Sequence, residues 1–138
     1  MFTLGLMHEQ GLSVPADAAE AYRWYERSAD EGYDEAQYRM GSIFFEGLLQ
    51  KEQNYELAFT WFMRAARQYQ LDAIFNVAYC YEHGLGVEEN RHEAIRYYKQ
   101  ASLLGDYEAK LSLVTLYEET EEAEKWRQAA ADQLNEQN

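Results

Sequence analysis

The chain has few of the residues that cross-link or interrupt small domains. It contains one cysteine, Cys80, and one proline, Pro15, in 138 residues. A lone cysteine cannot form an internal disulfide, which excludes the disulfide-scaffold class and favours a reducing compartment. Pro15 falls near the start, in an expected loop, so it interrupts no predicted helix.

Positive charge is also scarce. The sequence has 12 Lys and Arg against 25 Asp and Glu, and its formal net charge is −13. Nucleic acid and anionic membrane surfaces repel such a chain, so neither is an expected partner. It has no run of 18 apolar residues, so direct membrane insertion is not expected either. The same charge favours a basic protein partner.

What the sequence does contain is a unit of about 36 residues, present four times. A small residue recurs at steps of 36, 37 and 36 residues, and an alanine recurs at steps of 37, 36 and 29 residues, each with an aromatic three positions later. A repeat of this length predicts an all-α solenoid, in which stacked units bury one another's apolar faces. The recurring residues are Gly5, Gly41, Ala78 and Val114; Ala21, Ala58, Ala94 and Ala123; and Trp24, Trp61, Tyr97 and Trp126.

Each unit is predicted to form an antiparallel pair of helices within a single domain, residues 1–138. The units are about 1–33, 34–70, 71–106 and 107–138. First helices are expected at 2–10, 35–46, 72–83 and 108–119, the first three followed by Gly11, Gly47 and Gly84 as left-handed ends. Second helices are expected at 18–31, 55–68, 91–104 and 121–133, the first three capped by Asp17, Asn54 and Asn90. The fourth unit is shorter between its helices and acidic, as a solvent-facing cap would be.

Two rows of equivalent residues are predicted to form the core. The aromatic row of the second helices, Trp24, Trp61, Tyr97 and Trp126, recurs in register and is expected to fill the space opposite the small residues. In the first helices, the row Phe2, Tyr38, Phe75 and Leu111 is apolar in every unit and is also expected to be buried.

These motifs resemble the Sel-1-like repeat, a relative of the tetratricopeptide repeat. The resemblance lies in residues 36–41 (AQYRMG), 81–87 (YEHGLGV) and 58–66 (AFTWFMRAA), and it departs from the pattern at Gln50, Ala78 and Val114. It implies a right-handed α-solenoid of about four repeats, the first truncated at its start and the last shortened. It also implies an adaptor or scaffold, often bacterial, that binds proteins. In such stacks the first helices line the concave side.

The candidate binding residues follow from that implied geometry. Next to the apolar row of the first helices runs a row that is polar in every unit, Thr3, Arg39, Asn76 and Ser112, and residues three and seven positions further share its face. We expect this face to bind a protein or peptide, with arginine and tyrosine contributing most to recognition. The candidates are Arg39, Ser42, Glu46, Asn76, Tyr79, His83, Ser112 and Thr115.

No pattern in the sequence indicates catalysis, a cofactor or a metal. His8 stands in a row of the first helices that otherwise holds rings, namely Phe44, Tyr81 and Tyr117. His83 ends a helix and His92 lies in an exposed first turn, and no two of the three histidines have the helical spacing of a metal site. Cys80 lies in a helical stretch between two tyrosines, which favours a small buried residue over a nucleophile.

The sequence therefore predicts a non-enzymatic scaffold that binds a protein partner in the concave groove. The alternative is an inhibitor or immunity-type protein that covers a toxic enzyme. The first residues lack a basic segment and a small-residue cleavage site, so no signal peptide is expected. We expect a cytoplasmic protein, or a periplasmic or secreted one if the chain is the trimmed form of a longer precursor.

Overall fold

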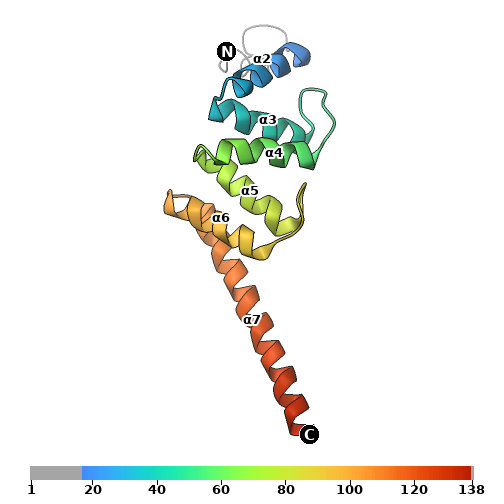
Figure 1. Cartoon of the computed structure of the whole chain (residues 1–138), viewed down its shortest axis with the longest axis vertical. Coiled ribbons are helices and arrows are strands. Elements are labelled where there is room, and N and C mark those ends of the chain that lie inside the picture. The colour runs from blue at the N-terminus through green and yellow to red at the C-terminus, as the bar shows by residue number, and fades with distance from the viewer. Residues whose placement is uncertain (1–16, 138) are drawn as a thin grey trace.

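The computed structural model describes residues 17–137, and within that range every regular element is a helix. The helices are α2 (Ala18–Asp30), α3 (Asp34–Glu46), α4 (Tyr55–Ala66), α5 (Leu71–His83), α6 (Arg91–Leu103) and α7 (Tyr107–Gln137). Each packs against the next to form a stack, from which α7 projects (Figure 1). The predicted all-α solenoid is confirmed. The helix expected at 2–10, with Gly11 and His8, lies outside the described residues.

Local sequence signals fix the helix ends within about two residues. The side chains of Asp17, Asn54 and Asn90 each accept a backbone N–H from the third residue beyond, at 3.1 Å. These bonds satisfy donors that the first turn of a helix leaves unpaired. Gly47 and Gly84 follow α3 and α5 in the left-handed conformation, with φ of 70° and 68°, and so end these helices as predicted.

Small residues allow the helices to approach closely. Alanines in both halves of the unit are completely buried, namely Ala36 and Ala73 in the first helices and Ala58 and Ala94 in the second. At Gly41 a Cβ atom would overlap the ring of Phe62 on α4, so glycine sets the distance between these two helices. Gly41 and Ala78 are therefore core positions, whereas Val114 in the same row is 55% exposed and Gly5 lies outside the described residues.

The tryptophan row is not the centre of the core. Trp24, Trp61 and Tyr97 are only half-buried, whereas the next residue in each unit is at most 1% exposed: Tyr25, Phe62 and Tyr98. The second helices turn the position after the tryptophan row toward the first helices. Trp61 instead lies at the edge, where the guanidinium carbon of Arg64 stands 4.4 Å from its ring centre. The side chain of Trp126 lies outside the described residues.

The predicted core row of the first helices is also wrong. Tyr38 and Phe75 are half-buried, Leu111 is 51% exposed, and Phe2 lies outside the described residues. The buried arc of α3 runs through Ala36, Met40, Ile43 and Phe44, and Tyr38 lies on the other side of the helix. These rings therefore belong to the surface that the second helices leave open.

The fourth unit does not fold back as a helix pair. Residues 108–119 and 121–133, predicted as two helices, form one continuous helix within the 31 residues of α7. The segment contains neither glycine nor proline, and glutamate, alanine, lysine and glutamine dominate its second half. These residues favour the helix, so nothing in the sequence interrupts it near Thr120.

Candidate protein-binding groove

The first helices present one face that the second helices leave open, which we call the first-helix face. It consists of the half-buried and exposed side chains on α3, α5 and the first three turns of α7. All eight predicted binding residues lie on it. Arg39, Ser42, Asn76 and Ser112 are half-buried, and Glu46, Tyr79, His83 and Thr115 are exposed.

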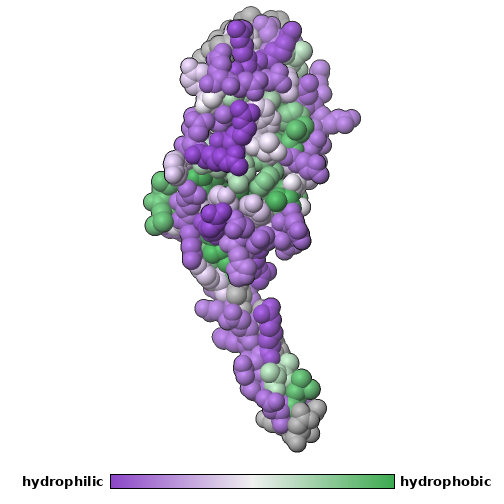
Figure 2. Space-filling view, in the orientation of Figure 1, coloured by the Kyte–Doolittle hydropathy of each residue, from purple (hydrophilic) through white to green (hydrophobic). Residues whose placement is uncertain are grey.

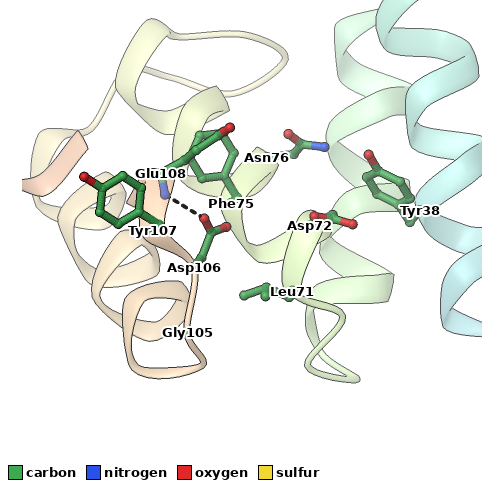
Figure 3. A pocket seen from close by; sticks show the side chains of 9 residues that line it. All are labelled: Tyr38, Leu71, Asp72, Phe75, Asn76, Gly105, Asp106, Tyr107 and Glu108. Atoms are coloured by element: carbon green, nitrogen blue, oxygen red, sulfur yellow. Dashed lines mark hydrogen bonds between the residues drawn. The ribbon is translucent and has the colours of Figure 1, made fainter. Parts of the chain in front are cut away.

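A pocket of about 460 Å³ opens on this face between α3, α5 and the turn from α6 into α7. Figure 3 shows Tyr38 and Tyr107 at opposite ends of the pocket, with Asp72, Phe75 and Asn76 between them. Asn76 is the one predicted binding residue that lines it. The lining residues are Tyr38, Leu71, Asp72, Phe75, Asn76, Gly105, Asp106, Tyr107 and Glu108.

Two of the three rings that line the pocket are held by the core behind them. Phe75 packs edge-on against buried Tyr98, with ring centres 5.4 Å apart, and Tyr38 packs against Phe62 at 5.9 Å. Asp106 is fixed as well, because its Oδ1 atom accepts the backbone N–H groups of Glu108 at 3.0 Å and Ala109 at 3.3 Å. Phe75, Tyr38 and Asp106 are thus preorganised, and a ligand would not need to order these three side chains. The ring of Tyr107 is 69% exposed.

The electrostatics of the pocket are one-sided. Three carboxylates line it, from Asp72, Asp106 and Glu108, and no lysine or arginine does. Arg39 stands beside it, with its guanidinium carbon 5.8 Å from the Tyr38 ring centre and a buried Nε atom that has no acceptor among the described residues. Aromatic faces next to carboxylates are suited to a guanidinium or ammonium group.

A second hollow of about 190 Å³ lies further along the same face, where α5 ends beside α7. His83 Nε2 lies 3.6 Å from Glu82 Oε1, and Arg91 lies 3.6 Å from Glu119. Glu82 also accepts a hydrogen bond of 2.7 Å from the hydroxyl of Tyr98. Burial, together with that carboxylate, raises the pKa of Tyr98 far above its usual value. Tyr79 stands between the two hollows, 38% exposed, with its ring centre 4.4 Å from that of His83.

The described residues offer little for catalysis. No group of three His, Cys, Asp or Glu among them is arranged to hold a metal ion. Cys80 is completely buried, and burial raises the pKa of its thiol to about 12. A thiol in that state is not a nucleophile at neutral pH. Along the described chain, no helix is long and apolar enough to cross a membrane.

Sequence reasoning missed most of the pocket. The sequence predicts a buried position for Tyr38 and Phe75 because their row is apolar in every unit, and no sequence signal marks the turn from α6 into α7 as part of a site. A helical wheel centred on the small residues would have found the two rings. Ala36, Met40 and Phe44 mark the buried arc of α3, and Tyr38 falls outside it.

The fold and its open first-helix face define the class of helical-repeat solenoids built from helix pairs. Within that class the chain belongs to the Sel1 repeat family. The family profile described as "Sel1 repeat" matches residues 1–33, 34–69 and 71–106. All of α7 therefore follows the last matched repeat, in agreement with its departure from the helix-pair pattern.

Known proteins similar to this chain include two curated relatives. The ERAD-associated E3 ubiquitin-protein ligase component HRD3 of Candida glabrata is 36% identical over 80 residues, which is 58% of this chain and 9% of that protein. The DAP3-binding cell death enhancer 1 of Rattus norvegicus is 34% identical over 91 residues, 66% of this chain and 17% of that protein. The chain thus spans less than a fifth of the length of either relative.

A solved structure shares the fold at a similar identity. It is the protective antigen c5321 of uropathogenic Escherichia coli, described as displaying an SLR fold. It superposes with a TM-score of 0.80 at 33% identity, over 83% of this chain and 24% of the antigen. The family and these relatives support the general description of a protein-interaction scaffold.

Proposed function

We propose that this chain is a non-enzymatic adaptor that binds a basic protein segment along its first-helix face. The observation that carries the proposal is the pocket between α3, α5 and α7, which is lined by three aromatic rings and three carboxylates and by neither lysine nor arginine. A lysine or arginine side chain would lie against the rings of Tyr38, Phe75 or Tyr107, with its charge near Asp72 and Asp106.

The neighbouring residues extend the contact beyond one side chain. Tyr79 and His83 stand further along the same face, and the half-buried Arg39 and Asn76 offer donors for backbone carbonyl groups of a bound segment. Tyrosine and arginine at the centre of an interface commonly dominate its energy. The names of the two relatives, a ubiquitin-ligase component and a DAP3-binding protein, refer to assemblies and fit an adaptor role.

Capture of partners from the native cell tests the proposal. Immobilised wild-type chain is compared with the variants Asp72→Asn and Tyr79→Ala, and with Arg23→Ala as a matched control on the exposed side of α2. We expect the first-helix variants to capture at least about tenfold less partner than the wild-type chain, and the control to capture as much as the wild-type chain. If Arg23→Ala abolishes capture and the first-helix variants do not, the partner uses the second-helix side and the proposal fails.

A further inference from the structure

Another pocket, of about 260 Å³, lies between α4 and α6. Only residues of the second helices and of the turn after α4 line it, among them Met63, Arg67, Tyr69, Arg96 and Tyr97. No first helix contributes to it. The pocket therefore lies outside the first-helix face.

The charge of this pocket is opposite to that of the protein. Two arginines line it and no carboxylate does, although the chain carries a formal charge of −13. Arg67 is exposed and makes no ion pair within residues 17–137. Arg96 is held in place, because its guanidinium bonds Glu93 at 2.7 Å and lies 4.7 Å from the ring centre of Tyr97.

Tyr69, which lines this pocket, adopts a backbone conformation that favours glycine. It follows α4 with φ of 64°, a left-handed conformation that glycine adopts easily and other residues rarely adopt. At the equivalent turns after α2 and α6 the chain has glycine, Gly32 and Gly105, also with positive φ. The Tyr69 side chain is 67% exposed and packs against no other ring in the described part of the chain. Unfavourable backbone geometry without compensating packing points to a role at the surface.

The floor of the pocket is rigid and amphipathic. The Tyr97 ring stacks on Tyr81 with centres 5.8 Å apart, and its hydroxyl lies 3.8 Å from the sulfur of Met63. The guanidinium of Arg96 stands 3.3 Å from the same hydroxyl. An extended segment lying here would meet two guanidinium groups and two phenol rings, the side chains that most often supply hot spots at interfaces.

We propose that this pocket is a second docking site, which takes an acidic protein segment. Carboxylates of the segment would pair with Arg67 and Arg96, and its backbone or apolar atoms would pack against Tyr69 and Tyr97. The chain then holds two segments of opposite charge, a basic one on the first helices and an acidic one on the second helices. Neither site needs the other to be occupied.

The test uses the full chain and a fluorescein-labelled peptide that alternates glutamate with alanine, followed by fluorescence anisotropy at low salt. The reference is the same peptide with glutamine at every glutamate. We expect the glutamate peptide to bind at least about tenfold more tightly than the reference, and Arg67→Gln and Tyr69→Gly each to weaken it about fivefold or more. The control Arg23→Gln, an exposed arginine that does not line the pocket, should leave binding unchanged.

The variant Tyr69→Gly distinguishes a loss of binding from a loss of stability. Glycine suits the left-handed turn, so the variant should keep its melting temperature while it loses affinity. Equal binding of the two peptides, or unchanged binding by both pocket variants, overturns the proposal. So does complete displacement of the peptide by inorganic phosphate, which would indicate a simple anion site. Tyr79→Ala on the first-helix face should not affect this peptide, so failure here and failure of the groove are distinguishable.

Discussion

A shift of one residue along the second helices separates buried rings from surface rings. Phe62 is 1% exposed and meets Gly41 and Tyr38, whereas its neighbour Trp61 is half-buried beside Arg64. The sequence gives both positions an aromatic in the matched repeats, so hydrophobicity alone cannot rank them. Because Phe62 is more deeply buried than Trp61, we expect it to contribute more to stability.

Truncation of the two rings should therefore have unequal effects. Phe62→Ala should lower the free energy of unfolding by about 3–5 kcal/mol, since it removes a completely buried ring and leaves a cavity. Trp61→Ala should cost about half of that or less, because part of its ring is already hydrated. Chemical denaturation of both variants measures the difference, and a larger loss for Trp61→Ala would contradict the assignment of the core.

Alkaline pH should destabilise the fold through buried acids. Burial raises the pKa of Cys80 to about 12, and it raises that of Tyr98 still further. In the unfolded chain these groups ionise near pH 8.5–10, so their contribution to stability is complete below that range and is lost as pH rises through the folded pKa values. Urea unfolding should show stability falling above about pH 9, and Tyr98→Phe should make that fall shallower. A stability that is flat up to pH 12 would contradict this mechanism.

Among the elements, loop 84–90 packs closely against the start of α4 in the preceding unit. Gly86 has φ of 72°, and a Cβ atom there would overlap the backbone carbonyl of Tyr55 at the start of α4. The glycine is thus needed twice, for the left-handed turn and for contact with the preceding unit. Gly32 shares the positive φ, 102°, but has open space where a Cβ would stand.

Alanine substitution at these two glycines distinguishes the cost of a left-handed backbone from the cost of a steric overlap. Gly32→Ala should lose about 1 kcal/mol from backbone strain alone. Gly86→Ala should lose clearly more, about 2–4 kcal/mol, because the loop must also move away from Tyr55. Thermal and urea unfolding of the two single variants give the comparison, and equal losses would show that the loop yields freely.

Helix α7 contains two parts with different support. Its first turns pack against α6 through Ala109, Leu113 and Leu116, whereas every described side chain from Glu118 onward is exposed. The part of α7 after Glu118 is therefore stabilised mainly by the helix propensity of its residues and by side-chain pairs. In one such pair, Gln128 Nε2 donates a hydrogen bond of 2.9 Å to Asp132 Oδ1.

Amide hydrogen exchange should reveal that division. We expect amides after Tyr117 to exchange at least about a hundredfold faster than those of α4 and α5, whose opening requires the core to separate. Deletion of residues 121–137 should then change the free energy of unfolding of the stack by less than about 1 kcal/mol. A larger loss would mean that the second half of α7 packs against something, such as another copy of the chain.

The sequence predicts where the helices begin and end more accurately than it predicts which side of each helix is buried. Caps at Asp17, Asn54 and Asn90, with Gly47 and Gly84 as ends, are local signals and predict five helices closely. Tyr38 and Phe75 could not be assigned from being apolar alone, since a binding groove and a core both take rings. The continuity of α7 was missed because the register of Ala123 and Trp126 suggested a helix pair, although no residue near Thr120 ends a helix.

For the whole molecule, we expect the local charge of each pocket to influence partner binding more than the net charge of the chain does. The pocket between α3, α5 and α7 has three carboxylates and neither lysine nor arginine in its lining, with Arg39 beside it. The α4–α6 pocket has two arginines and no carboxylate in its lining, with Glu93 paired to Arg96. Figure 2 shows a largely hydrophilic face with hydrophobic atoms only in separate small areas, so large apolar contacts do not dominate this view. Long-range electrostatics are therefore expected to guide encounters.

Salt should slow association with a basic partner. Raising ionic strength from about 0.05 to 0.5 M shortens the screening length from over 10 Å to about 4 Å, and the association rate should fall by about tenfold or more. The dissociation rate should change little. Stopped-flow measurements with a lysine-rich peptide give both rates, and an association rate that is insensitive to salt would rule out electrostatic steering.

The projecting helix also governs how the molecule rotates in solution. At about 1.5 Å per residue, the 31 residues of α7 extend for about 46 Å, more than twice the length of any helix in the stack. A particle drawn out in this way turns slowly end over end and quickly about its long axis. Nuclear relaxation rates would then depend on the direction of each N–H bond, and those aligned with α7 would report the slowest tumbling (Figure 1).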